Sequence, residues 1–155
     1  MDDLARLVAI EEIKTLKSRY FHALDRKNMT AYAATFTDDA EVDVRGVMST
    51  EEQGETLAGF DEKAVLVGGK AMAELVATTM GDIKTVHYGY MPQIEIMSET
   101  TAKGMWGLED RLWYPEGAPH RFFHGFGHYH ETYRKTADGW RIASMRITRL
   151  RILME

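Results

Sequence analysis

Hydrophobic positions recur every three or four residues along the first part of the chain, which predicts a long amphipathic helix ending near Arg26. Asp2 or Asp3 is a suitable N-cap for this helix, and further acidic residues follow in its N-terminal half. The apolar stripe consists of Leu4, Leu7, Val8, Ile10, Ile13, Leu16, Tyr20, Phe21 and Leu24.

Two shorter helices are predicted after it. Asn28 can cap a helix over residues 29–36, and Thr37-Asp38-Asp39 ends it. Residues 70–80, followed by Gly81, form the third helical pattern. The segment between them, residues 48–69, is acidic and contains glycine, so we expect a long connection there.

Strand patterns occupy the rest of the chain. Polar and apolar residues alternate over 41–47, which predicts a half-buried strand. Four longer segments are rich in β-branched and aromatic residues, and Asp138-Gly139 between the last two indicates a hairpin turn. These predicted strands cover residues 86–97, 102–114, 122–136 and 140–153.

Helices followed by long strands predict an α+β fold in a single domain, residues 1–155. We expect a cone-shaped barrel, in which a curved, mixed but mainly antiparallel sheet wraps around the N-terminal helices. The interior of such a cone can hold a ligand.

Composition and charge narrow the classes of function. The chain has no cysteine, which excludes disulfides, thiol nucleophiles and cysteine-ligated metals. A formal net charge of −5 offers no basic footprint for nucleic acid. No apolar run approaches the ~20 residues of a membrane helix, and no secretory signal pattern opens the chain. We expect a cytoplasmic domain with a small-molecule partner, no nucleic acid and no membrane.

Asp25 and His87 are the first candidates for chemistry. The dipole disfavours an acid at a helix C-terminus, so Asp25 is either a solvated end residue or a buried carboxylate that orients a histidine. His87 opens a predicted strand and is either a structural histidine or a general base. Tyr20 lies on the apolar stripe, as a core residue or a phenol donor.

The strand acids and the last-strand arginines give further candidates. Asp110 shares the more apolar face of its strand, where a buried acid needs a partner. Arg146 and Arg149 lie on opposite faces of the last strand, so one can neutralise a cavity carboxylate while the other is solvated. We expect Val42, Leu108 and Tyr129 to line the substrate pocket.

Three histidines share one face of the strand over 122–136. His124, His128 and His130 could ligate zinc, but no accompanying ligand signature is present, so a surface or subunit-contact face is the simpler interpretation. The opposite face carries Gly125 and Gly127, which would leave room for a pocket floor.

The order and spacing of several short motifs resemble the SnoaL-like family, in the superfamily of ketosteroid isomerase, scytalone dehydratase and nuclear transport factor two. The resemblance covers nearly the whole chain and is greatest to the dehydratase branch. It is carried by Ile10-Glu11-Glu12-Ile13 leading to Tyr20 and Asp25, by Phe36-Thr37-Asp38-Asp39-Ala40, by Thr85-Val86-His87-Tyr88-Gly89, by Gly127-His128-Tyr129-His130-Glu131 and by Asp138-Gly139-Trp140-Arg141-Ile142.

The resemblance implies a cone-shaped α+β barrel whose cavity holds an Asp–His dyad, at positions that match Asp25 and His87. It also implies roles for Tyr20 and for Asp110. The family's last-strand arginine falls near Met145 when counted from Trp140, so Arg146 fits it only with a shifted register. No cofactor or metal is implied, and homo-oligomers, trimers or dimers, are common in the family.

Four functions compete at this point. The first is a cofactor-independent lyase or isomerase that acts on a small apolar cyclic substrate, with His87, Asp25, Tyr20, Asp110 and Arg146 as catalytic residues. The alternative is a non-catalytic ligand-binding or assembly subunit, such as a module like the small subunit of ring-hydroxylating dioxygenases. An epoxide hydrolase and a metal hydrolase that uses the histidine face rank below these two.

Overall fold

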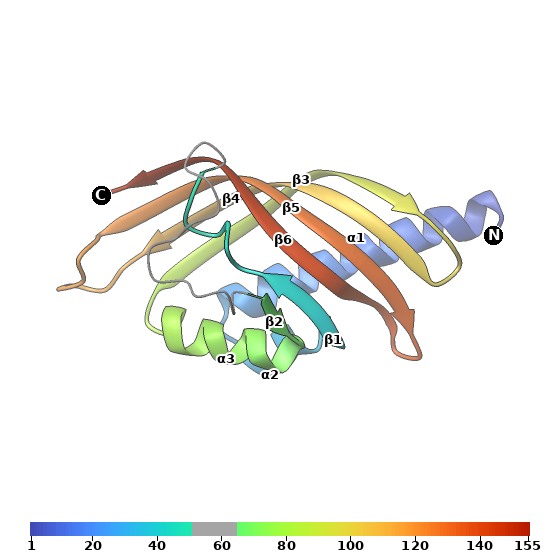
Figure 1. The fold of residues 1–155 in the computed structure, drawn as a ribbon, viewed down its shortest axis with the longest axis horizontal. Helices are drawn as coiled ribbons and strands as arrows, with labels where there is room; N and C mark the ends of the chain where they lie inside the picture. The colour runs from blue at the N-terminus through green and yellow to red at the C-terminus, as the bar shows by residue number, and fades with distance from the viewer. Residues whose placement is uncertain (51–64) are drawn as a thin grey trace.

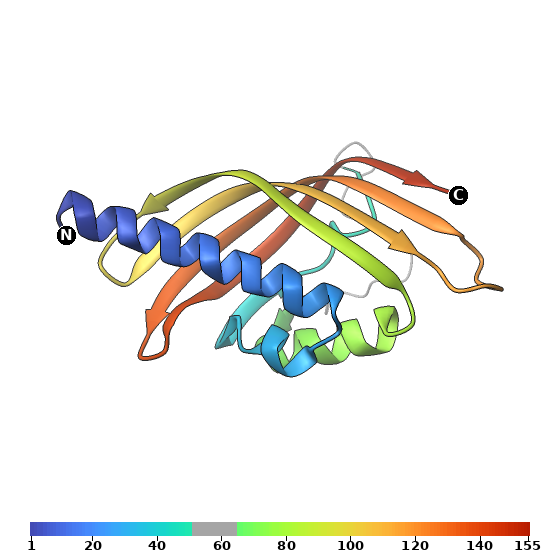
Figure 2. The ribbon, with the colours of Figure 1, turned by 180° about the vertical axis from the view of Figure 1, so that it is seen from behind.

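The computed structural model describes residues 1–50 and 65–155, and one curved sheet arches over three helices in it (Figure 1). Helix α1 (Asp3–Asp25) crosses the concave face of the sheet diagonally (Figure 2). It begins after Asp2, whose side chain accepts a hydrogen bond from the Ala5 N–H at 2.7 Å. The predicted apolar stripe is not buried over its first two turns: Leu4 and Leu7 are exposed, and the first buried residue of the helix is Ala9.

Helix α2 (Met29–Ala33) is shorter than predicted, whereas α3 (Gly69–Met80) agrees with the prediction. Strand β1 (Phe36–Asp43) begins where we expected α2 to continue. The reason is tertiary, since Phe36 pairs with Ile142 and the Thr35 carbonyl accepts the Ile142 N–H at 2.9 Å. Pairing with a distant strand therefore overrides a local helical preference.

Within residues 1–50 and 65–155, the sheet has six strands in the order β2-β1-β6-β5-β4-β3. Only the β1–β6 pair is parallel, so the sheet is mixed and mainly antiparallel, and it is not closed. The α+β prediction is confirmed. The remaining strands are β2 (Val65–Val67), β3 (Lys84–Ile96), β4 (Thr101–Trp113), β5 (Phe122–Thr136) and β6 (Gly139–Met154).

The predicted hairpin at Asp138-Gly139 joins β5 to β6. Gly139 has a φ of +98°, a conformation that is readily available only to glycine. Most of the predicted 48–69 connection lies outside the described residues, and its final part contains β2.

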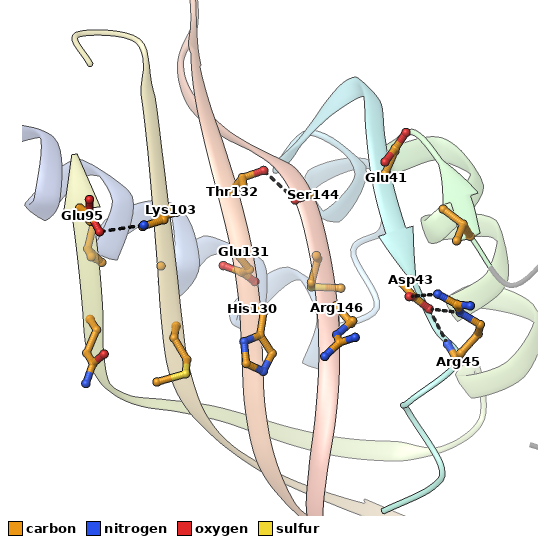
Figure 3. A pocket seen from close by; sticks show the side chains of 16 residues that line it. Glu41, Asp43, Arg45, Glu95, Lys103, His130, Glu131, Thr132, Ser144 and Arg146 are labelled. Carbon is orange, nitrogen blue, oxygen red and sulfur yellow. Dashed lines mark hydrogen bonds and ion pairs between the residues drawn. The ribbon is translucent and has the colours of Figure 1, made fainter. Parts of the chain in front are cut away.

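Alternation along the strands separates two faces of the sheet. The inner face covers α1 and contributes buried residues such as Trp106, Tyr129 and Ile142. The outer face carries a broad depression of about 810 Å³ that spans strands from β3 to β1 (Figure 3). No helix in the described part of the chain is long and apolar enough to cross a membrane.

Candidate active site

A small enclosed cavity of about 90 Å³ lies between the inner face of the sheet and helices α1, α2 and α3. Apolar side chains form most of its wall, with a few polar groups among them. Its lining consists of Tyr20, Leu24, Tyr32, Asp43, Val44, Val47, Met48, Met72, Val76, Met80, His87, Asp110, Leu112, Phe123, Tyr129, Met145, Ile147 and Arg149. Apolar walls with few polar groups are typical of small-molecule sites.

Asp25 and His87 meet at the edge of this cavity. The His87 Nδ1 atom lies 2.6 Å from Asp25 Oδ1, and the His87 backbone N–H donates to Asp25 Oδ2 at 2.9 Å. This backbone N–H is available because β3 is an edge strand of the sheet. Since an ionised carboxylate can only accept, we assign the ring proton to Nδ1 and a free lone pair to Nε2.

A third bond holds Asp25. The Thr85 hydroxyl donates to Asp25 Oδ1 at 2.9 Å and accepts a hydrogen bond from Lys27 Nζ at 2.7 Å. Burial lowers the pKa of Lys27 from its usual value, and the neighbouring Asp25 carboxylate opposes that shift. The carboxylate therefore receives three hydrogen bonds, which fix its orientation toward His87. Thr85 was not among the sequence candidates, although its spacing of two from His87 places both on one face of β3.

Asp110 is the direct cross-strand neighbour of His87. It is buried and forms a bidentate ion pair with Arg149, with Oδ1 2.6 Å from Nη1 and Oδ2 2.7 Å from Nη2. The Arg149 Nε–H donates to the Val47 carbonyl at 2.9 Å. Asp110 Oδ2 lies 3.9 Å from His87 Nε2, too far for a hydrogen bond. The second acid of the site is thus neutralised by arginine.

Gly125 makes room for this ion pair. A Cβ atom at Gly125 would lie 2.5 Å from Asp110 Oδ1 and would also collide with the Arg149 guanidinium. The sequence suggested that Gly125 and Gly127 leave space for a pocket floor. Instead, the space above Gly125 is filled by Asp110 and Arg149, and a Cβ at Gly127 would collide with the Thr148 backbone.

Arg149, and not Arg146, is the last-strand arginine that reaches the cavity. Met145, Ile147 and Arg149 alternate inward along β6, so Arg146 points to the outer face. Figure 3 shows Arg146 beside His130, with both lining the outer depression. The structure therefore does not bring Arg146 to the other site candidates. Of the two last-strand arginines considered in the sequence, Arg149 is the one that lines the cavity.

Three tyrosines from different elements line the cavity: Tyr20 of α1, Tyr32 of α2 and Tyr129 of β5. The rings of Tyr20 and Tyr32 are 5.1 Å apart, and those of Tyr20 and Tyr129 are 6.1 Å apart. Burial raises the pKa of Tyr20, Tyr32 and Tyr129 above its usual value. All three phenols therefore stay protonated at neutral pH and can donate hydrogen bonds.

A buried ion pair lies behind these tyrosines. Lys17 Nζ is 2.5 Å from Glu131 Oε1, and the Tyr133 hydroxyl donates to Glu131 Oε2 at 2.5 Å. The same ammonium lies 4.0 Å from the ring centroid of Tyr20 and 3.5 Å from that of Tyr129. Burial lowers the pKa of Lys17, while Glu131 opposes the shift.

Neither Lys17 nor Glu131 was a sequence candidate. A signal was present for Lys17, because its spacing of four from Ile13 and three from Tyr20 places it on the apolar stripe.

Two predicted pocket residues lie elsewhere in the core. Val42 and Leu108 are buried but do not line the cavity, whereas Tyr129 does. Val42 pairs with Met145 across the parallel β1–β6 ladder, and Met145 is the residue that reaches the cavity. The alternation of polar and apolar residues along a strand correctly predicts that these side chains are buried. It does not predict whether a buried side chain lines the cavity or packs elsewhere in the core.

The histidine face lies outside the cavity. His124 Nε2 is 2.7 Å from Glu109 Oε1, and His130 Nε2 is 2.9 Å from the Thr148 hydroxyl. Within residues 1–50 and 65–155, no group of three His, Asp or Glu side chains is arranged to hold a metal ion. Self-association through this face stays a prediction, and Tyr88, Tyr90 and Trp113 are exposed there.

An arched α+β sheet over a helix, with an Asp–His pair at an enclosed cavity, defines a class of cone-shaped folds. The model of the SnoaL-like domain family matches residues 5–146. The chain belongs to the SnoaL-like family.

Solved structures with the same fold cover almost the whole chain. A type 2 hexachlorocyclohexane dehydrochlorinase, LinA, is 18% identical with a TM-score of 0.78, over 99% of this chain and 93% of its own. A provisionally named scytalone dehydratase from Novosphingobium aromaticivorans is 20% identical with a TM-score of 0.78, over 97% and 90%. The Kfla4162 protein from Kribbella flavida is 21% identical with a TM-score of 0.79, over 96% and 95%. At these identities the likeness establishes the fold.

Proposed function

We propose that the chain is a cofactor-independent lyase or isomerase that removes a proton from a small, neutral, apolar cyclic substrate. The observation that carries this proposal is the 2.6 Å contact between His87 Nδ1 and Asp25 Oδ1 at the enclosed cavity. A histidine whose Nδ1–H is held by a carboxylate keeps Nε2 as a proton acceptor and gains stability when it becomes an imidazolium. Among the similar structures are a dehydrochlorinase and a provisionally named dehydratase, and eliminations of this kind begin with the same proton removal.

In the proposed step, His87 Nε2 takes a proton from a carbon next to an electron-withdrawing group. The electron pair of that C–H bond forms a carbon–carbon double bond, and the leaving group departs with its own bonding pair. A departing hydroxide receives a proton from the imidazolium, so the products are an alkene and water. In the isomerase variant, the proton returns to a different carbon and nothing leaves.

Tyr20 and Tyr129 are proposed as hydrogen-bond donors to the oxygen or leaving group on which negative charge develops. Their phenols suit this role because burial raises their pKa and keeps the O–H intact. Asp110 is proposed to orient the substrate near His87. Its bidentate pair with Arg149 cancels its charge, which favours a neutral substrate over an anionic or cationic one.

The test uses a panel of small cyclic compounds with a hydroxyl or halide one carbon away from an activated C–H. Each compound is incubated in D₂O with the wild-type protein, and proton NMR reports alkene formation and deuterium uptake. We expect turnover that falls by about 10²–10⁴ in His87→Gln, the typical contribution of a general base. A similar loss is expected in Asp25→Asn, which frees the imidazole to take the wrong tautomer.

His124→Gln is the matched control, since His124 also contacts a carboxylate but lies on the outer face. We expect it to retain wild-type turnover. Full turnover in His87→Gln would refute the proposed base. Saturable binding of these compounds without any reaction or deuterium uptake would instead favour the alternative of a non-catalytic binding module.

A further inference from the structure

A second pocket lies against a different face of α1 from the cavity. It has a volume of about 400 Å³ and shares no lining residue with the cavity. The C-terminal half of α1, the α2 region and the start of β6 form its walls. Its polar side chains are almost all hydrogen-bond donors, from Arg19, His22, Arg26, Asn28 and Arg141.

The donors that line this pocket come from different elements. Arg19, His22 and Arg26 are spaced three and four residues apart, so they share one face of α1. Arg141 comes from β6, and its guanidinium is held by the carbonyls of Asp138 and Trp140 at 3.1 and 3.0 Å. Asn28 uses its side-chain oxygen to cap α2, which leaves its amide N–H groups for a ligand.

None of the described residues that line this pocket is an Asp or Glu, although the chain carries 24 acidic and 19 basic residues. Elsewhere in the described chain, Arg45, Arg111, Arg134 and Arg149 each pair with an Asp or Glu. Within that same part of the chain, the side chains of Arg19 and Arg26 form no ion pair or hydrogen bond. Guanidinium groups gathered around one pocket repel one another, and a bound anion removes that repulsion.

The charge and shape of the pocket indicate the class of anion. Three guanidinium groups carry more charge than one carboxylate can neutralise, whereas a phosphate monoester or a diphosphate matches it. The planar guanidinium fork also suits phosphate oxygens, which it binds with two parallel hydrogen bonds. The apolar part of the lining is Leu16 and three alanines, Ala23, Ala31 and Ala34, which leaves room for an organic group.

We propose that this pocket is a binding site for a small organic phosphate, which Arg19, Arg26 and Arg141 hold by its phosphate group. The site is separate from the proposed acid–base chemistry and does not depend on it. Its ligand contacts a different face of α1 from the one that carries Tyr20 and Leu24 into the cavity.

The test measures binding of phenyl phosphate, pyrophosphate and inorganic phosphate by isothermal titration calorimetry at low salt. We expect saturable one-to-one binding of phenyl phosphate, no weaker than that of inorganic phosphate, because the apolar floor accepts the ring. The Arg19→Gln/Arg26→Gln double variant should weaken binding at least about tenfold, since it removes charged hydrogen-bond donors. Both residues are exposed, so the variant should fold as the wild type does.

Arg151→Gln is the matched control, an exposed arginine outside the pocket, and it should leave the affinity unchanged. The proposal is overturned if none of the three anions binds saturably, or if Arg151→Gln weakens binding as much as the double variant does. Binding of inorganic phosphate without binding of phenyl phosphate would overturn the organic phosphate as the ligand. Proton-transfer assays with His87→Gln are unaffected by any of these outcomes, so the two proposals fail independently.

Discussion

Two neighbouring acids on β4, Asp110 and Glu109, lie on opposite faces of the sheet. Each is close to a histidine and an arginine, so the two clusters contain nearly the same types of residue. Asp110 points inward to His87 and a bidentate Arg149. Glu109 points outward, where His124 and Arg111 each lie 2.7 Å from its Oε1 and the Tyr90 hydroxyl donates to Oε2 at 2.7 Å. Both sites combine a carboxylate, a histidine and an arginine.

The two clusters differ in their exposure to solvent and in which ring nitrogen of the histidine contacts the carboxylate. Arg149 is 2% exposed, whereas the Arg111 side chain is 43% exposed. In the outer cluster Glu109 occupies His124 Nε2, while in the inner site Asp25 holds His87 Nδ1 and leaves Nε2 facing the cavity. Residue types alone therefore do not make a site; the inner cluster is distinguished by its burial and by the cavity that His87 lines.

The largest expected difference between the two clusters is in stability. Arg149→Met leaves Asp110 as an unpaired buried charge, so we expect the free energy of unfolding to fall by about 3–5 kcal/mol. Arg111→Met removes a solvent-screened ion pair and should lower it by at most about 1 kcal/mol. Urea unfolding followed by circular dichroism measures both. An Asp110→Leu/Arg149→Met double variant should recover most of the loss, because no buried charge remains.

Equal losses in Arg149→Met and Arg111→Met would show that enclosure does not separate the two ion pairs. If the double variant does not regain stability, the packing of the two side chains, and not their charge, determines the loss in the free energy of unfolding.

A smaller difference is expected for the glycines beside the two clusters. Gly125→Ala places a methyl group against Asp110 and Arg149 in the enclosed site, and overpacking of this kind typically lowers stability by about 1–3 kcal/mol. Gly107→Ala is the matched change on the outer face, where the nearest atom, Tyr90 Cβ, is 3.3 Å from the new methyl group, a contact that a displacement of a few tenths of an ångström relieves. We expect an effect within about 0.5 kcal/mol there. Thermal unfolding of both variants measures this contrast, and a Gly107→Ala loss as large as that of Gly125→Ala would contradict it.

The smallest expected effect is a pH dependence that originates on the outer face. Hydrogen bonds from Tyr90, His124 and Arg111 lower the pKa of Glu109 to about 2, against 4.5 for an ordinary glutamate. A folded-state pKa below the unfolded value stabilises the protein above pH 4.5, and this contribution is lost as pH falls toward 2. Because Glu109 lies near the surface, salt and solvent screening limit the contribution to less than about 1 kcal/mol.

Urea unfolding between pH 6 and pH 3 tests this, with Glu109→Gln as the variant that lacks the titrating group. We expect the wild type to lose more stability than the variant over this range, and the gap to shrink at high salt. The same pH dependence in both proteins would show that Glu109 does not contribute.

The sequence alone predicted most of the local structure. The period of three to four residues identified α1, Gly81 marked the end of α3, β-branched and aromatic residues identified the long strands, and Asp138-Gly139 identified the hairpin. These features depend on residues close together in the chain, so a one-dimensional pattern contains them. Tyr20, Asp25, His87 and Asp110 were also predicted as candidates, but their proximity rested on the resemblance to a known family.

Only the tertiary structure decided which side chains meet. Arg149 replaces Arg146 because the register of β6 against β5 determines which residues of the strand point inward. Val42 and Leu108 are buried in the core, but only the fold shows that the cavity is lined by other residues, among them Met145 and Tyr129. Thr85, Lys17 and Glu131 became visible as partners only when β3, α1 and β5 were brought together. A local pattern determines which face a residue occupies, whereas the contacts that give a buried charge its partner depend on strand order, register and the path of α1 across the sheet.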